Sequence, residues 1–359
     1  MRIGIVIRNI TGPLTGVGRF ITSVLDALQK IDPDNTYFIF EKNPSGYVPE
    51  NKNWKKISDK TKIPGLLWLQ CKVPLYCRQY RIDTLWVPEQ ICPFFGMKNV
   101  KIVSTIYDLV FIHYPQTIHS SNLRIMKLFI PPTLKKSHRV VTISNFIKAD
   151  IEKHFPFLKT KVDPVYCGHP DWKEAYGTMD VKRGEHLLFV GNYEPRKNLI
   201  NIFKALEILL QKGKLVALHI AGPPGWNNKE IKDYIENSPV KDQVKLLGYI
   251  TEQQLSKEYQ LCKAFIFPSL YEGFGLPVLE ALLMECPVIT SQGSVMEEIA
   301  EDSVLYCDPY KPEDIADKIL DLDRFIATPF KSRYQKVLSK YSWEKTAQLL
   351  LKTFSGKSS

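Results

Sequence analysis

Short apolar segments alternate with helical patterns along almost the whole chain, and this alternation constrains the fold most. The expected strands form two series, one at residues 1–7, 36–40, 84–87, 100–106, 138–143 and 162–167, and one at residues 186–191, 215–221, 244–248, 264–268, 287–290 and 304–307. Strands that alternate with helices are typical of parallel sheets. The 359 residues are enough for two α/β domains, each with its own core.

A segment with few apolar residues, from Gly168 to Gly184, separates the two series and is interpreted as a linker. The last helical pattern runs from Tyr341 to Phe354. The predicted domains are therefore 1–170 and 171–335, followed by a helical segment at 336–359.

Two glutamates, Glu272 and Glu280, bracket a loop that follows an expected strand. Gly273 and Gly275 let the backbone approach a ligand closely, and Pro277 suits the first turn of a helix, whose free N–H groups attract anions. Because carboxylates do not bind phosphate, we expect them to accept hydrogen bonds from hydroxyl groups. A site that binds an anion, beside carboxylates that accept hydrogen bonds from hydroxyl groups, suits a sugar nucleotide. The alternative is a solvated loop residue and a glutamate favoured by the helix dipole.

A second loop carries two adjacent cations, Arg196 and Lys197, after the apolar run Leu187–Val190 and before a helical pattern that begins at Leu199. Ligands of open α/β sheets bind at the carboxyl ends of strands. An arginine and a lysine together can clamp a diphosphate. A solvated basic pair is the alternative, although cations oppose the dipole at a helix start.

A glycine-containing loop, Thr11–Arg19, follows the first expected strand and precedes a helix predicted from Phe20. A dinucleotide-binding motif would have a third glycine where Ile21 stands, and Glu41 would imitate its ribose-binding acid. Because the glycine is missing and the other two loops would go unexplained, nicotinamide binding is disfavoured. A flexible loop that approaches phosphate remains the interpretation.

These segments together resemble a retaining glycosyltransferase of the GT-B fold, in family 4, over nearly the whole chain. The family's pair of glutamates with seven residues between them matches Glu272 and Glu280. Its G-x-x-x-P-R-K-N segment matches Gly191–Asn198, its amino-terminal glycine loop matches Gly16–Phe20, and its I-S-x-F turn matches Ile143–Phe146.

The resemblance implies two Rossmann-like parallel-sheet domains that face each other across a cleft, with a C-terminal helix that crosses back to the first domain. It implies transfer of a hexose, with mannose as first choice, from a nucleoside diphosphate sugar to a saccharide or lipid-linked saccharide. The implied setting is assembly of a surface polysaccharide such as O-antigen, capsule or exopolysaccharide. The alternatives are a sugar-nucleotide epimerase or phosphorylase, and a catalytically silent sugar-nucleotide-binding subunit.

The resemblance also implies roles for particular residues. The implied catalytic residues are Asp108, Arg196, Lys197 and Glu272. The implied donor-binding residues are Gly16, Val17, Gly191, Arg196, Lys197, Glu272, Gly273, Phe274, Gly275, Leu276 and Glu280. The family often has a histidine where this chain has Tyr107, so a role of that histidine does not carry over, whereas Asp108 matches.

The chain is basic, and its charge is concentrated in the first half. Residues 1–169 contain 24 Lys and Arg against 12 Asp and Glu, a net charge of +12, while the remaining residues have a net charge of −2. An anionic membrane surface is the expected partner of residues 1–169, and the segment Pro64–Arg78, with Trp68 beside cations, resembles an interfacial segment. An amphipathic helix packed on the core is the alternative for this segment. No nucleic-acid recognition motif accompanies the charge.

We expect no metal and no cofactor. Asp32 and Asp34 have the spacing of a metal-binding pair, but turn chemistry explains them, and the seven histidines show no paired ligand spacing. Seven scattered cysteines without a C-x-x-C pair favour free thiols in a reducing compartment. Residues 1–7 are too short for a signal peptide, and no apolar run is long enough to span a membrane. The expected location is the cytoplasm, with peripheral binding to the inner face of the membrane.

Overall fold

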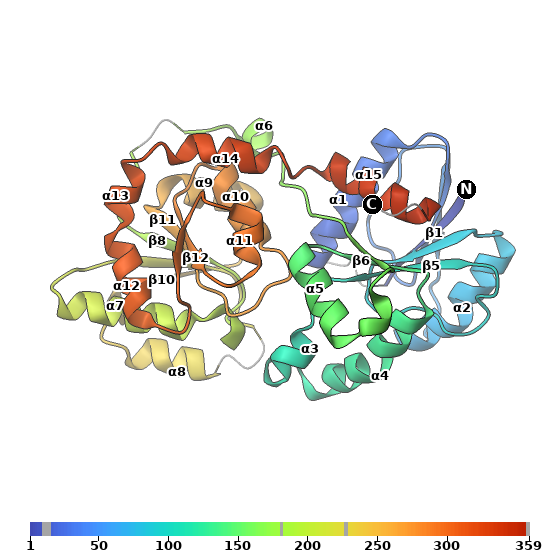
Figure 1. Cartoon of the computed structure of the whole chain (residues 1–359), viewed down its shortest axis with the longest axis horizontal. Helices are drawn as coiled ribbons and strands as arrows, with labels where there is room; N and C mark the ends of the chain where they lie inside the picture. Colours follow the sequence, from blue (N-terminus) through green and yellow to red (C-terminus); the bar gives the residue numbers. More distant parts are fainter. Residues whose placement is uncertain (9–15, 180–181, 226–228, 357–359) are drawn as a thin grey trace. The chain divides into compact units, whose positions relative to one another are not determined.

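The computed structural model describes residues 1–359 except 9–15, 180–181, 226–228 and 357–359. The chain forms two compact units (Figure 1). The first unit consists of Met1–Phe111, Ser120–Gly168 and Tyr341–Ser359, and the second of Ile112–His119 and His169–Lys340. Thr11–Thr15 of the predicted glycine loop lie outside the described residues.

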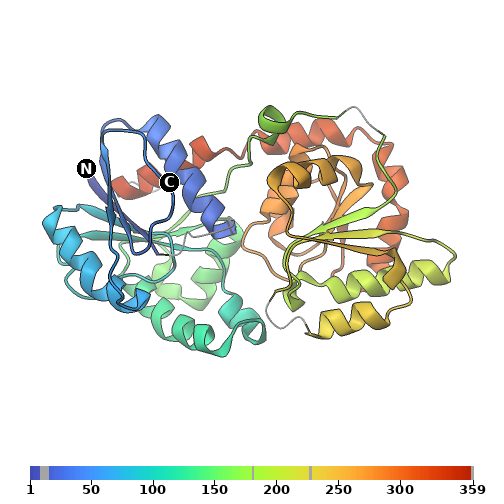
Figure 2. The same ribbon diagram turned by 180° about the vertical axis from the view of Figure 1, so that it is seen from behind.

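A seven-stranded parallel sheet forms the centre of the first unit, in the order β3-β2-β1-β4-β5-β6-β7. Its strands are β1 (Arg2–Ile7), β2 (Thr36–Glu41), β3 (Trp54–Ser58), β4 (Thr84–Val87), β5 (Lys101–Ile106), β6 (Arg139–Thr142) and β7 (Val162–Pro164). The four central strands are buried almost throughout, as in parallel sheets that helices cover on both faces (Figures 1 and 2).

The helices of the first unit follow the predicted alternation. They are α1 (Gly16–Ile31), α2 (Gly65–Gln79), α4 (Ser120–Lys136), α5 (Asn145–His154) with the 3₁₀ turn η2 (Pro156–Leu158), and α15 (Trp343–Ser355), while α3 (Val110–His113) spans the boundary with the second unit. Helix α1 begins at Gly16 rather than at the predicted Phe20, so the loop prediction was wrong for residues 16–19. A helical glycine costs about 1 kcal/mol relative to alanine. Burial of Phe20 and Ile21 outweighs that cost.

The C-terminal helix α15 belongs to the first unit and lies beside α1 (Figure 1). The ring centres of Trp343 and Phe20 are 6.1 Å apart, and those of Phe354 and Trp86 are 6.0 Å apart. The backbone of Gly168 passes so close to this helix that a Cβ atom there would lie 2.3 Å from the Trp343 nitrogen. The predicted return of the terminal helix to the first domain is confirmed.

A six-stranded parallel sheet forms the centre of the second unit, in the order β10-β9-β8-β11-β12-β13. Its strands are β8 (Leu187–Val190), β9 (Leu218–Ala221), β10 (Val244–Gly248), β11 (Ala264–Phe267), β12 (Val288–Ser291) and β13 (Leu305–Cys307). Its helices are α6 (Trp172–Tyr176), α7 (Leu199–Gln211), α8 (Lys229–Asn237), α9 (Glu252–Leu261), α10 (Leu276–Leu283), α11 (Val295–Ala300), α12 (Pro312–Leu320), α13 (Leu322–Ile326) and α14 (Phe330–Leu338), with the 3₁₀ turns η1 (Pro115–Thr117), η3 (Pro195–Lys197) and η4 (Lys241–Gln243). Strands β8 and β11 are neighbours, so the loops that follow them emerge side by side.

Two elements were not predicted. Strand β3 is an edge strand whose sequence, WKKIS, contains two lysines and buries only Trp54. Edge strands often carry lysine, which blocks further pairing but also hides the strand pattern. Helix α6 lies within the predicted linker, and its Trp172 is buried and donates a hydrogen bond to Glu252 Oε2 at 3.3 Å.

The interfacial interpretation was wrong for Trp68. Its side chain is fully buried in α2, and its Nε1 donates to Asp59 Oδ2 at 3.0 Å. The alternative, a helix packed on the core with Pro74 inside it, is what the structure shows, although Leu67 and Leu75 remain exposed. No helix in the described part of the chain combines the length and the hydropathy of a membrane span.

Two other acidic positions have structural partners. Asp32 Oδ1 accepts hydrogen bonds from the backbone nitrogens of Asp34 and Asn35, both at 3.2 Å, which confirms the turn interpretation. Glu41 is fully buried at the end of β2, where it accepts a hydrogen bond from the Ser45 hydroxyl at 2.7 Å. It therefore does not serve as a ribose-binding acid.

Candidate functional site

The loop after β8 is fixed against the end of the neighbouring strand β11. Gly191 has a φ of 145°, which glycine tolerates best, and the turn Pro195–Lys197 follows. Asn198 ends this turn with a φ of 65°, in the left-handed region that asparagine enters more readily than most residues. Its side-chain amide donates to the carbonyl oxygens of Pro268 at 2.9 Å and Pro309 at 2.6 Å. The two cations of the turn are thereby held in place.

The loop after β11 runs directly into α10. Gly275 caps the helix with a φ of 110°, and a Cβ atom there would lie 2.7 Å from Met296 Sδ. Pro277 stands in the first turn, as predicted. The Leu270 nitrogen donates to the Arg196 carbonyl oxygen at 2.8 Å, which joins this loop to the first one. The predicted residues Glu272, Gly273, Phe274, Gly275 and Leu276 all lie in this loop and at the start of α10.

The two loops meet in a cluster of four charged side chains. Glu272 Oε1 lies 2.6 Å from Lys197 Nζ and 3.1 Å from Arg196 Nη1. Glu194 Oε2 lies 3.1 Å from Arg196 Nε. The side chains are only 12–20% exposed. Two cations and two carboxylates therefore balance each other at the carboxyl edge of the sheet.

Both members of the closest pair have shifted pKa values. Burial would raise the pKa of Glu272, but the charges of Lys197 and Arg196 outweigh it and hold that pKa below its usual value. Burial lowers the pKa of Lys197, and the facing Glu272 opposes this shift. Lys197 Nζ also lies 4.8 Å from the ring centre of Phe267. Because the Glu272 carboxylate is ionised at neutral pH, it accepts hydrogen bonds and does not donate them.

Glu280 lies one turn into α10, and its side chain is almost completely buried. Its Oε2 accepts a hydrogen bond from the Tyr259 hydroxyl at 3.2 Å, and this hydroxyl lies equally far from the Pro277 carbonyl oxygen. Tyr259 comes from α9 and is itself fully buried. A buried carboxylate fixed on one side can hold a polar ligand group in one position.

The sequence located this cluster but not its internal pairing. Arg196, Lys197 and Glu272 were predicted to act separately on phosphate and sugar, whereas the structure joins them in one ion-pair network. Glu194 was not predicted as a partner, although it stands two residues before Arg196. Tyr259 carries no sequence signal, because it lies on a helix outside every motif.

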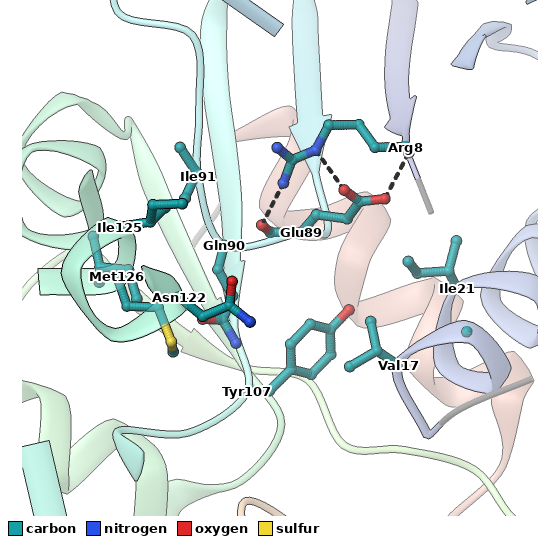
Figure 3. A pocket seen from close by; sticks show the side chains of 12 residues that line it. Arg8, Val17, Ile21, Glu89, Gln90, Ile91, Tyr107, Asn122, Ile125 and Met126 are labelled. Carbon is teal, nitrogen blue, oxygen red and sulfur yellow. Dashed lines mark hydrogen bonds and ion pairs between the residues drawn. The ribbon is translucent and has the colours of Figure 1, made fainter. Parts of the chain in front are cut away.

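The first unit has its own cavity of about 450 Å³ at the carboxyl ends of β1, β4 and β5 (Figure 3). Its lining is mainly apolar, with Arg8, Val17, Gly18, Ile21, Glu89, Gln90, Ile91, Tyr107, Asn122, Ile125, Met126 and Ile130. Arg8 Nε and Glu89 Oε2 form an ion pair at 2.5 Å. The buried Tyr107 hydroxyl has no hydrogen-bond partner among the described residues. An apolar cavity with a few polar groups is typical of a site for an organic ligand.

The remaining predicted residues also belong to the first unit. Val17 lines the cavity, and Gly16 begins α1 at a point where an added Cβ atom would meet no other part of the described chain within 4 Å. Asp108 follows Tyr107 and is half-buried, and its Oδ1 accepts a hydrogen bond from the Val110 nitrogen at 3.1 Å. The histidine that often stands beside this aspartate is replaced by a tyrosine that faces the cavity.

The family model for glycosyl transferases group 1 matches residues 180–324, the stretch that contains both loops and the charged cluster. Residues 180–324 of this chain therefore form a glycosyl transferases group 1 domain. The chain has the GT-B architecture predicted from the sequence, with two parallel sheets and a C-terminal helix.

Individual relatives match different fractions of this chain. O-antigen chain mannosyltransferase B of Escherichia coli is 25% identical over 92% of this chain and 93% of its own length. The serotype-specific mannosyltransferase WbdA of Escherichia coli is 30% identical over 60% of this chain, but only 26% of its own length is covered. The crystal structure of Anabaena Alr3699/HepE in complex with UDP and glucose superposes with a TM-score of 0.73 at 15% identity, over 99% of this chain and all of that one. This last likeness concerns the fold alone.

Proposed function

We propose that this glycosyl transferase moves a hexose from a nucleoside diphosphate sugar to a hydroxyl group of a saccharide or lipid-linked saccharide, with retention of the anomeric configuration. The charged cluster at the ends of β8 and β11 carries this proposal, because it combines cations for a diphosphate with carboxylates for hydroxyl groups. Mannose is the first choice of sugar, because relatives are named as mannosyltransferases, and surface polysaccharide assembly is the first choice of setting, because two of them are named as O-antigen chain mannosyltransferases.

Each part of the donor has a proposed partner. Arg196 and Lys197 would bind the diphosphate, together with the backbone N–H groups at the start of α10. Glu280 would accept hydrogen bonds from the ribose hydroxyls, and its contact with Tyr259 would fix its position. Glu272 would accept hydrogen bonds from hydroxyls of the sugar. Gly191, Gly273, Phe274, Gly275 and Leu276 would form the backbone of this donor site, and Gly16 and Val17 are proposed to bind the donor as well.

The cluster is proposed to stabilise the departing diphosphate. Glu272 and Glu194 hold Lys197 and Arg196 in fixed positions, so both cations would be preorganised for the phosphate. As the bond between the anomeric carbon and the β-phosphate oxygen breaks, negative charge grows on the phosphate, and both cations interact with it more strongly. Interactions that strengthen along the reaction are the ones that increase the rate.

The acceptor oxygen would attack the anomeric carbon from the face that the diphosphate leaves, and its proton would pass to the departing phosphate. Asp108 would orient the acceptor hydroxyl. Because two cations and a helix start supply the positive charge, we propose that the transfer itself requires neither a metal ion nor a cofactor. The cavity of the first unit, with its apolar walls and the Arg8–Glu89 pair, is proposed as part of the acceptor site.

The first unit is also proposed to bind an anionic membrane surface through residues 1–169, on the cytoplasmic face. Helix α4 contains four basic residues, among them Arg124 and Lys127, and no acidic one. Exposed apolar side chains accompany them: Leu128 is 67% exposed, and Phe95 is 75% exposed. Basic and apolar groups on one surface favour anionic lipid, and nothing in the charge pattern favours nucleic acid.

Turnover of a labelled donor tests the proposed function. Purified chain with GDP-mannose and a lipid-linked saccharide should release GDP and give a mannosylated product, whereas Arg196→Ala with Lys197→Ala should not. A product epimerised at the sugar would favour an epimerase, and donor binding without turnover of any nucleotide sugar would favour a silent binding subunit. Neither alternative is supported by the named relatives.

A further inference from the structure

Three side chains from distant parts of the chain converge at the amino end of the second sheet. His186 directly precedes β8, His219 is the second residue of β9, and Glu258 lies on α9. Glu258 Oε2 is 3.1 Å from His219 Nδ1 and 3.5 Å from His186 Nε2. The donor loops leave the opposite, carboxyl ends of these strands, so this cluster is separate from the charged cluster described above.

The hydrogen bonds of the cluster are incomplete. His186 Nε2 is shielded from solvent and makes no hydrogen bond within the described part of the chain. Both imidazoles approach the same carboxylate oxygen, and their rings stack with centres 3.8 Å apart. The histidines and the carboxylate each offer one ligand atom, and these atoms lie within 4.8 Å of one another.

The atoms that converge here are of the kinds that bind zinc, namely imidazole nitrogens and a carboxylate oxygen. Lys245 would repel a bound cation, but it is exposed and screened by solvent.

We propose that His186, His219 and Glu258 form a zinc site, with water completing a tetrahedral set. Two histidines and one glutamate are a ligand set that zinc uses in proteins. The ion would tie β8, β9 and α9 together, and the residue after Glu258 on α9 is Tyr259, which hydrogen-bonds Glu280. The site is distant from the phosphate chemistry, so the role of zinc here is structural.

Zinc binding requires a local change that can be measured. With zinc–nitrogen distances of about 2.0–2.1 Å, two imidazoles on a tetrahedral ion have ring centres roughly 5 Å apart. The stacked rings must therefore separate by about 1 Å. Their side chains are 16% and 19% exposed, which leaves access for an ion. A simple stacked pair on a carboxylate is the alternative, and it predicts no metal affinity.

The test uses the full chain, stripped with EDTA and then titrated calorimetrically with zinc or with magnesium. Zinc should bind with one ion per chain and raise the melting temperature, while magnesium, which prefers oxygen ligands, should not bind. His219→Gln and Glu258→Gln should each weaken zinc binding by at least about tenfold. His138→Gln is the matched control, because this exposed histidine is flanked by Lys101 and Arg139.

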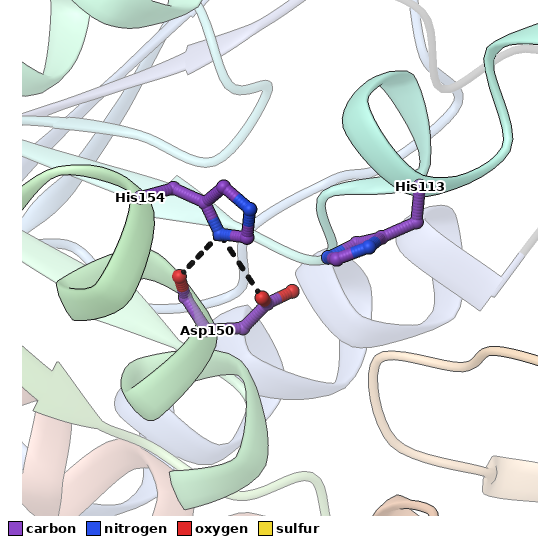
Figure 4. Close-up of side chains that lie close together, drawn as sticks. All are labelled: His113, Asp150 and His154. Carbon is purple, nitrogen blue, oxygen red and sulfur yellow. Dashed lines mark hydrogen bonds and ion pairs between the residues drawn. The ribbon is translucent and has the colours of Figure 1, made fainter.

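A second pair, His154 and Asp150 on α5, is a rival position, with 3.2 Å between His154 Nδ1 and the carboxylate (Figure 4). If His154→Gln abolishes zinc binding while His219→Gln does not, the proposal is wrong. It is also wrong if no saturable zinc binding occurs. X-ray absorption spectroscopy of the zinc-loaded wild type needs no variant. Imidazole and oxygen ligands without sulfur would support the proposed site, and sulfur among the zinc ligands would overturn it.

Discussion

Lys197→Met tests the charged cluster most directly, because it removes the cation and keeps the length of the side chain. In the native protein Nζ lies 2.6 Å from Glu272 Oε1, and the two side chains are 13% and 12% exposed. Removing one partner of a buried ion pair costs about 3–5 kcal/mol. Arg196 remains 3.1 Å from the same oxygen, so we expect the free energy of unfolding to fall by the smaller amount of about 2–3 kcal/mol.

The catalytic effect should be separable from the effect on stability. Losing one preorganised donor to a developing negative charge typically reduces the rate by about 10²–10³-fold. Adding Glu272→Gln removes the carboxylate that has lost one of its two cations, so the double variant should regain most of the lost stability but none of the lost rate. Urea denaturation and initial rates with a labelled donor measure the two quantities on the same preparations.

Lys212→Met is the control for this series. Lys212 pairs with Asp317 at 3.6 Å, but the side chains are 52% and 62% exposed, so its loss should change stability by less than about 1 kcal/mol. If Lys197→Met unfolds at the same urea concentration as the wild type, the cluster does not stabilise the fold as argued. If the double variant turns over at the native rate, Lys197 does not act on the diphosphate.

Three further outcomes are expected. Burial raises the pKa of Asp59, but hydrogen bonds, first among them that from Tyr76, outweigh it and lower the pKa to about 2. Its contribution, about 2 kcal/mol, is therefore fully present above pH 4 and mostly lost as the pH falls to 2, and Asp59→Asn should destabilise the protein at pH 7 but hardly at pH 2 in chemical unfolding. In a variant without the zinc ligands, EDTA should leave transfer activity largely intact. If EDTA abolishes the activity and added magnesium or manganese restores it, the reaction uses a metal ion. The full chain should sediment with anionic but not neutral vesicles at low salt, and Arg124→Glu with Lys127→Glu should abolish this while Lys232→Glu should not.

The positions of most strands followed from apolar runs, because buried parallel strands have a continuous apolar sequence, whereas their order in each sheet was not predicted. Strand β3 was not predicted, because an edge strand with two lysines has no continuous apolar run. The start of α1 at Gly16 was also missed, because glycine suggests a loop unless the burial of the next residues is known. Trp68 appeared interfacial beside its basic neighbours, and only tertiary packing shows that it is buried.

The candidate site, like the fold, could be predicted only in part from the sequence. Arg196, Lys197 and Glu272 were located from loops at strand ends, because topology alone brings such loops together. Their mutual pairing depends on side-chain geometry, which no local pattern encodes. The cluster around Glu258 was invisible for a related reason: its histidines lie before β8 and within β9, so their proximity depends on the register of the two strands.

The position of α15 determines the order in which the two units can be completed during translation. All residues of the second unit leave the ribosome before Trp343, so that unit can fold while the chain is still being synthesised. The first unit begins earlier but finishes last, because Phe20 and Trp86 stay uncovered until the final helix emerges. A nascent chain therefore exposes apolar surface of the first unit until Trp343–Ser355 has emerged, and a chain truncated before this helix has one complete unit and one incomplete unit.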